Sequence, residues 1–168
     1  MTWKAHIYSA FGPSFLAFCL PTALGYQIPA LYRGLFSLSL MFGAILPDID
    51  LRSPLLTHRT ITHCWYLWTA LCVATPFMEI TNPSILMAIT GLSVGCLLHI
   101  LGDMLTYAGV PLGLNPFGKT FSFNLFASGS PKELPVVIFS LGLSFLAFYI
   151  INPGQMPTLQ QLLDVQTM

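Results

Sequence analysis

The chain has 168 residues, of which 55% are hydrophobic and only 7% are charged, and its mean hydropathy is +0.74. Soluble domains carry about 25% charged residues, so this composition excludes a soluble globular protein and predicts one membrane-embedded domain. The formal net charge is zero, and the sequence has no basic stripe of the kind that binds nucleic acid.

Five apolar stretches predict an all-α, polytopic membrane protein with about five transmembrane helices. Crossing the hydrocarbon layer takes about 20 mainly apolar residues, and the candidate spans are residues 7–26, 31–46, 61–80, 83–105 and 134–151. Residues 1–151 then form one helical domain, and residues 152–168 form a C-terminal tail. Pro13 and Pro21 interrupt the first stretch, which we interpret as retained rather than as a cleaved signal peptide. The prolines and the short link 27–33 leave open a broken pair of helices in place of the first two spans.

Lysine and arginine are distributed unequally between the two sides that five spans create. If the N-terminus is cytoplasmic, the outer side holds only Arg33, and the inner side holds Lys4, Arg52, Arg59, Lys119 and Lys132. Positive residues favour the cytoplasmic side of short loops. We therefore predict a multi-pass protein with its N-terminus in the cytoplasm.

A long connection rich in glycine and proline, residues 106–133, separates the last two spans. Gly109 and Pro111 predict the exit from the fourth helix. Residues 121–126 alternate apolar and polar side chains, which indicates a strand or a segment that dips into lipid headgroups. Connections of this length are often lids or binding loops, so we expect this one to be a lid over a site.

The histidines and three of the six acidic residues gather on one predicted face of the membrane. In chain order the set consists of His6, Asp48, Asp50, His58, His63, His99 and Asp103. His99 and Asp103 are four residues apart, so both side chains leave the same face of a helix. Asp48 and Asp50 diverge on a regular helix, but both can reach one site from a helix end or a turn after Pro47.

Buried ionisable groups in a membrane are costly, and a divalent cation among carboxylates and imidazoles offsets that cost. Imidazole nitrogen and carboxylate oxygen are the usual ligands of zinc, and they also suit manganese or iron. A plain hydrogen-bonded polar plug between helices stays open, and His58 could instead bind a lipid phosphate beside Arg52 and Arg59. The four cysteines fit buried apolar positions and contain no C-x-x-C pair. No Gly-x-Ser-x-Gly motif indicates a serine nucleophile.

Three ordered motifs resemble the YdjM-like family. They are Leu46-Pro-Asp-Ile-Asp50, His58-Arg-Thr-Ile-Thr-His63 and the run from His99 to Pro111, with Ala5-His6 near the N-terminus. That family is described as LexA-regulated inner-membrane proteins that are predicted metal-dependent hydrolases. The resemblance covers about residues 5–120. It implies a bacterial inner-membrane location and a metal site at the cytoplasmic helix ends.

Two positions depart from the family pattern. Leu51 stands where members often have histidine, which removes one potential ligand, and Thr60 stands where they usually have glycine. The order of histidines and aspartates is also similar, more distantly, to the zinc phospholipase C and P1 nuclease group. That likeness implies that Asp103 bridges two metal ions.

These observations lead to the hypothesis of a membrane-bound hydrolase of a phosphoester or lipid-linked substrate that arrives from the membrane lipids. The divalent metal, zinc first and manganese or iron as alternatives, has as expected ligands His6, Asp48, His58, His63, His99 and Asp103. Asp50 is a candidate ligand or general base, and Arg59 is a candidate for stabilising an oxyanion. The rival hypothesis is a non-enzymatic membrane protein with a structural metal or a role in binding metal or lipid. The oligomeric state is left open.

Overall fold

The computed structural model describes residues 1–52, 59–113, 115 and 117–152. Its long elements are the α-helices α1 (Trp3–Ala23), α2 (Ala30–Gly43), α3 (Trp65–Ala74), α4 (Pro83–Met104) and α5 (Glu133–Ile151). Its short elements are the 3-10 helices η1 (Leu46–Arg52), η2 (Ile61–His63) and η3 (Thr75–Phe77), and the strands β1 (Val110–Pro111) and β2 (Thr120–Phe121). The prediction of a mainly helical protein is confirmed.

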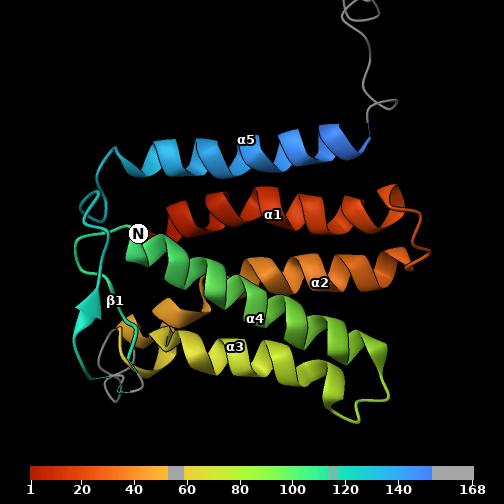
Figure 1. The fold of residues 1–168 in the computed structure, drawn as a ribbon, viewed down its shortest axis with the longest axis horizontal. Coiled ribbons are helices and arrows are strands. Elements are labelled where there is room, and N and C mark those ends of the chain that lie inside the picture. The colour runs from red at the N-terminus through yellow and green to blue at the C-terminus, as the bar shows by residue number, and fades with distance from the viewer. Residues whose placement is uncertain (53–58, 114, 116, 153–168) are drawn as a thin grey trace, which may run out of the picture.

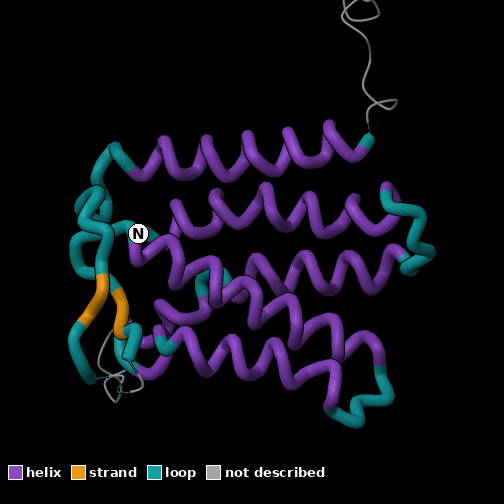
Figure 2. The backbone as a smooth tube through the Cα atoms, in the orientation of Figure 1, coloured by secondary structure: helices purple, strands orange, loops and turns teal. Residues whose placement is uncertain are grey.

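The helices lie side by side in the order α5, α1, α2, α4, α3 (Figure 1). The most extensive packing is between α2 and α4, which form the centre of the bundle. The N-terminus, η1, η2, the end of α4 and the start of α5 share one end of the bundle, together with the two strands (Figure 2). The links from α1 to α2 and from α3 to α4 lie at the other end. This topology gathers polar segments that are far apart in the sequence.

Three helical segments in the described chain are long and apolar enough to cross a membrane: Ala30–Leu51, Pro83–Met104 and Glu133–Ile151. The first combines α2 with η1. The predicted span 61–80 is divided into η2, the 10-residue α3 and η3, and α3 is too short to cross the hydrocarbon layer alone. The predicted first span corresponds to α1, which is outside those three. The structure therefore confirms helices that can cross a membrane, and the total of five transmembrane helices remains a prediction.

Glycine allows α2 and α4 to approach each other closely. A Cβ atom on Gly95 would lie 2.0 Å from the Leu40 carbonyl oxygen, and one on Gly43 would lie 2.1 Å from that of Leu92. Small residues at such crossings let helix backbones touch inside membranes. The close approach also brings the C-terminal end of α2, with the Ala44 carbonyl, against α4.

A serine side chain satisfies the backbone carbonyl that Pro13 leaves open in α1, and a serine pair joins α1 to α2. Pro13 has no N–H, so the Ser9 carbonyl loses its usual donor in the helix. Ser140 of α5 donates its hydroxyl to that carbonyl over 2.6 Å. Between α1 and α2, Ser14 and Ser37 each donate to the other's carbonyl, at 2.9 and 3.0 Å. The interrupted helix α1 therefore stays continuous because its neighbours supply donors.

The segment after α4 folds back across the end of the bundle. β1 pairs antiparallel with β2, and Thr106 forms a parallel bridge with Phe126, whose side chain is buried. The predicted strand at 121–126 is thus a two-residue strand, Thr120–Phe121, followed by irregular chain. Gly109 has a φ of +63°, and a Cβ there would lie 2.2 Å from the Phe121 carbonyl oxygen, so this turn requires glycine.

The proline and serine arrangement predicts a specific stability effect. Ser140→Ala should lower the free energy of unfolding by about 1 kcal/mol, because the Ser9 carbonyl loses its donor in an apolar bundle. In a Pro13→Ala background, the new N–H restores the helical bond to Ser9, and the same substitution should cost much less. Unfolding in mixed detergent micelles measures both values. Equal costs in the two backgrounds would contradict the assignment.

Candidate metal centre

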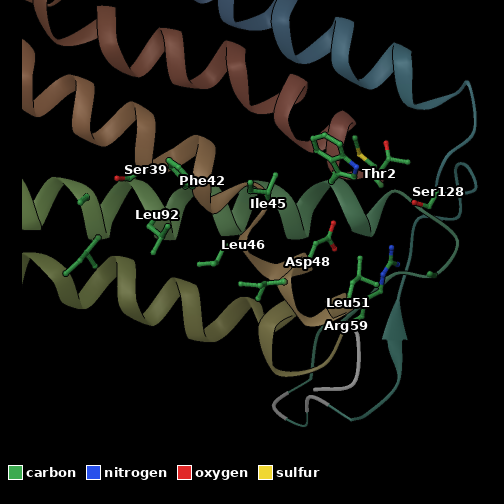
Figure 3. Close-up of a pocket in the computed structure, with 16 residues that line it drawn as sticks. Thr2, Ser39, Phe42, Ile45, Leu46, Asp48, Leu51, Arg59, Leu92 and Ser128 are labelled. Atoms are coloured by element: carbon green, nitrogen blue, oxygen red, sulfur yellow. The ribbon is translucent and has the colours of Figure 1, made fainter. Parts of the chain in front are cut away.

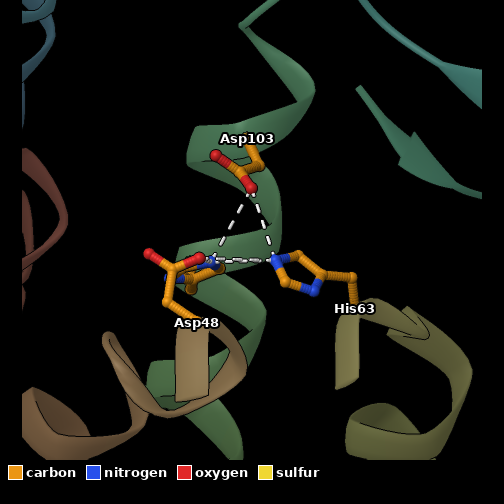
Figure 4. Close-up of side chains that lie close together, drawn as sticks. Asp48, His63 and Asp103 are labelled. Atoms are coloured by element: carbon orange, nitrogen blue, oxygen red, sulfur yellow. Dashed lines mark hydrogen bonds and ion pairs between the residues drawn. The ribbon is translucent and has the colours of Figure 1, made fainter. Parts of the chain in front are cut away.

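Four side chains from three elements converge at the polar end of the bundle, and Figure 4 labels three of them, Asp48, His63 and Asp103. Asp48 comes from η1, His63 from η2, and His99 and Asp103 from the last turns of α4. Each offers one ligand atom, and these four atoms all lie within 4.8 Å of one another. His63, His99 and Asp103 are fully buried, and the side chain of Asp48 is 13% exposed.

Five of the six distances between the four ligand atoms are close to the edges of a zinc tetrahedron, and the sixth, between Asp48 and Asp103, is at most 4.8 Å. His99 Nε2 lies 3.2 Å from His63 Nε2, 3.4 Å from Asp48 Oδ1 and 3.7 Å from Asp103 Oδ2. His63 Nε2 lies 3.4 Å from Asp103 Oδ2 and 3.8 Å from Asp48 Oδ1. Tetrahedral zinc, with ligands at about 2.0–2.2 Å, separates its ligand atoms by about 3.3–3.6 Å. The space between these atoms therefore has the size of a zinc site.

A backbone carbonyl fixes the tautomer of His99. Its Nδ1 lies 2.8 Å from the Ala44 carbonyl oxygen, and a carbonyl can only accept, so Nδ1 carries the hydrogen. The Nε2 atom then presents a lone pair to the other three ligand atoms. A ligating histidine almost always donates its second ring N–H to a carbonyl or carboxylate in this way.

A hydroxyl and a carboxylate fix the tautomer of His63. Thr62 Oγ1 donates its one hydrogen to Asp50 Oδ2, 2.5 Å away, so it accepts from His63 Nδ1 at 3.0 Å. Asp50 Oδ2 itself lies 3.5 Å from the same ring nitrogen. Burial lowers the pKa of His63, which lies outside the candidate membrane spans, and Asp103 opposes this shift. In the neutral ring with its hydrogen on Nδ1, the Nε2 lone pair is directed at the cluster.

With the hydrogens of both rings on Nδ1, the two Nε2 atoms have no hydrogen to share, and the guanidinium of Arg59 lies beside the cluster, 3.2 Å from Asp103 Oδ2. Two lone pairs face each other over 3.2 Å, next to two carboxylate oxygens. Asp103 Oδ2 is buried and accepts no well-aligned hydrogen bond among the described residues. A buried polar atom in this condition is costly. A divalent cation at the centre satisfies all four atoms at once, so the donor set fits a metal.

The conformation of η1 explains how two nearby aspartates serve the same histidine. A 3-10 helix has three residues per turn, so Asp48 and Asp50 leave η1 in different directions. Asp48 faces Nε2 of His63, and Asp50 faces Nδ1 of the same ring. One carboxylate is thus placed as a ligand, and the other orients the imidazole from behind.

Arg59 connects the cluster to the segment after α4. Its guanidinium lies 3.2 Å from Asp103 Oδ2 and donates to Thr106 Oγ1 at 3.3 Å and to the Gly109 carbonyl at 3.0 Å. Its backbone N–H donates to Asp50 Oδ2 at 3.2 Å. The φ of Arg59 is +60°, which is uncommon for a residue with a side chain and persists where surrounding contacts impose it.

Two further predicted ligands, His6 and His58, are not among the four atoms of the cluster. His6 stacks on His99, with ring centroids 3.7 Å apart, and its Nε2 lies 3.3 Å from Asp103 Oδ1. The amino group of Met1 contacts the same oxygen. His6 therefore meets the side of Asp103 that faces away from the cluster. His58 lies outside the described residues.

Sequence reasoning missed three groups that orient the site. They are the Ala44 carbonyl behind His99, the Thr62 hydroxyl behind His63, and Thr106, which accepts from Arg59 and donates to the Asp103 carbonyl at 2.8 Å. Thr62 and Thr106 could have been found as hydroxyl residues beside predicted ligands. The Ala44 carbonyl has no signature in the sequence, because any residue supplies one.

The contacts behind His63 predict the effect of removing its hydroxyl partner. Thr62→Val should weaken zinc binding by about 10- to 100-fold, the usual effect of losing a contact that orients a ligand. Thr90→Val is the matched control, because the Thr90 hydroxyl only caps the Leu86 carbonyl within α4. Competition with a chromogenic chelator measures the affinity. Unchanged affinity in Thr62→Val would count against the assigned tautomer.

Comparison with known proteins agrees with these motifs. The family model described as YdjM inner membrane protein matches residues 1–157, which include every residue of the cluster. No curated relative and no solved structure matches the chain significantly. The resemblance in the three motifs is therefore confirmed, and the chain belongs to the YdjM inner membrane protein family.

Proposed function

We propose that this protein is a membrane-bound, metal-dependent hydrolase of a phosphoester or lipid-linked substrate. The observation that carries the proposal is the convergence of two fixed imidazole lone pairs and two carboxylate oxygens on one point. Asp48, His63, His99 and Asp103 would hold the divalent cation, with zinc the first choice and manganese or iron the alternatives. Such an ion supplies a hydroxide nucleophile near neutral pH and polarises the bond to be broken.

Access from one side favours catalysis over a purely structural role. Asp48 and Arg59 both line a cavity of about 1280 Å³ that lies against the cluster, whereas structural zinc sites are closed by their four ligands. A zinc ion can expand to five ligands during a reaction. A substrate in the cavity would approach past Asp48, the one partly exposed member of the cluster.

Two charged residues have proposed roles beside the ion. Arg59 presents a forked guanidinium next to Asp103 and the cavity, where it would stabilise the oxygen that becomes more negative during the reaction. Asp50 is 2% exposed and lies behind His63, so we assign it the positioning of that ring rather than proton transfer to substrate. His6 would orient Asp103 in the same manner, and His58 remains a predicted ligand.

The topology and the charges support a cytoplasmic location for the site. Lys4, Arg59, Lys119 and Lys132 belong to segments at the polar end of the bundle, and Arg33 belongs to the start of α2 at the other end. The positive-inside rule then assigns the polar end to the cytoplasmic side of the bacterial inner membrane. The segment after α4 would cover the site as a lid.

A structural metal is the second candidate, because four buried ligand atoms are enough to complete a tetrahedron. In that case the ion would hold η1 and η2 against α4 without reacting. The two candidates agree on metal binding and differ on turnover, so separate measurements distinguish them.

Metal content tests the premise that both candidates share. His99→Ala should lose most bound zinc, because it removes one corner of the tetrahedron and leaves the Ala44 carbonyl without its donor. Cys96→Ala is the control, since Cys96 is equally buried one turn earlier on α4. Elemental analysis of the detergent-purified protein measures the ion. Wild-type protein that binds no divalent metal after reconstitution would refute both candidates.

Turnover separates the two candidates. Metal-loaded wild type should hydrolyse aryl phosphate esters, a chelator should abolish the activity, and added metal should restore it. Arg59→Lys should reduce kcat by about 100-fold, the usual effect of losing one group that stabilises an oxyanion, with metal content unchanged. Full metal occupancy without hydrolysis of any phosphoester would establish the structural role instead.

A further inference from the structure

The cavity beside the metal centre is a long, mainly apolar groove along α2 and α4 (Figure 3). Its walls follow the two helices, which run parallel, and both begin at the end that carries Asp48. On one side they are Ile45, Phe42 and Ser39, and on the other side they are Leu92, Ile89 and Ala88. At about 1280 Å³, it exceeds the usual 300–1,000 Å³, roughly, of sites for small ligands.

The groove faces the region where lipid chains would surround the protein. Both walls belong to segments that qualify as membrane spans, Ala30–Leu51 and Pro83–Met104. The side chains of Phe42 and Ile49, at its border, are 66% and 58% exposed. An apolar groove between two candidate membrane spans fits a hydrocarbon chain that enters laterally from the bilayer.

The end of the groove near η1 has a different chemistry. Asp48 and Arg59 are the only charged side chains that line it within the described chain, and both lie at this end (Figure 3). A guanidinium such as that of Arg59 can bind phosphate oxygens in a fork, and a divalent cation on Asp48 would add a second positive contact. This end therefore fits an anionic phosphate that is attached to the chain in the apolar part.

We propose that the groove binds one hydrocarbon chain of a phosphate-headed membrane lipid, with the phosphate ester held between Arg59 and Asp48. The groove deepens the proposed function by naming its substrate class, and the reaction at the metal centre rests on that function. In that reaction the oxygen of water bonds to phosphorus, the P–O bond to the lipid alcohol breaks, and one proton passes to the leaving oxygen. The products are a phosphate and the chain-bearing alcohol.

Photo-crosslinking tests the site without any need for turnover. Wild-type protein in nanodiscs is incubated with palmitoyl lysophosphatidic acid that carries a diazirine either near the ester or at the end of the chain. The probe near the ester should label Ile45 and Leu46, and the terminal probe should label the region of Ser39 and Ala88. Unmodified palmitoyl lysophosphatidic acid should compete, and palmitic acid without the phosphate should compete poorly.

Substitutions that fill the groove should block this labelling. Ala88→Phe on one wall and Ser39→Phe on the other should each reduce it about tenfold, the effect of withdrawing about two methylene groups from an apolar site. Ala70→Phe on the exposed face of α3 is the matched control and should leave it unchanged. Size-exclusion profiles and metal content identify any variant that fails to fold. If one of the two variants fails to fold, the variant on the opposite wall provides the test.

The outcomes separate this inference from the proposed function. A loss of lipid turnover in Ala88→Phe that is larger than its loss of aryl phosphate hydrolysis supports both. Labelling of the groove without hydrolysis by the wild type supports the lipid site and refutes the hydrolase. Labelling spread over the outward residues of α5, such as Phe139 and Ile150, or the same labelling pattern from both probes, overturns the groove as a lipid site.

Discussion

The geometry of the site depends on two imidazole rings whose Nε2 atoms face each other over 3.2 Å. The Ala44 carbonyl holds one ring, and Thr62 with Asp50 holds the other. Each support comes from a different segment, so η1, η2 and the end of α2 must all be in place around α4. The fold brings several lone pairs and two carboxylates close together, which is unfavourable in a buried site. A bound cation would attract all of these groups and would stabilise the folded protein.

Glycine at the crossing of α2 and α4 is the structural condition for this arrangement. Only with Gly43 and Gly95 at the contact can the end of α2 come near enough for its carbonyl to reach His99. The same crossing forms the walls of the groove. The same helix contact therefore determines three things: the packing of α2 on α4, the orientation of His99 and the shape of the groove. A larger side chain at either glycine would affect all three.

Much of the site was accessible from the sequence because it obeys helix periodicity. His99 and Asp103 are one turn apart and do converge, and Asp48 joins them from the segment after Pro47. The different tasks of Asp48 and Asp50 could not be predicted, because they depend on a 3-10 helix rather than on residue type. The division of span 61–80 was also hidden, since hydropathy does not record where Pro76 and the turn at His63 break a helix. His6 has the right residue type, but its position on the far side of Asp103 depends on how α1 packs.

The shortness of α3 has a consequence for the surrounding bilayer. Its 10 residues rise about 15 Å, half of the hydrocarbon thickness of about 30 Å. A helix of this length in a bilayer would leave part of the hydrocarbon layer to η2 and η3 at its two ends, or the surrounding lipids would thin to match it. The neighbouring helix α4 carries two ligands of the candidate metal centre, so thinning of the bilayer around α3 would act on the helix that supports the site.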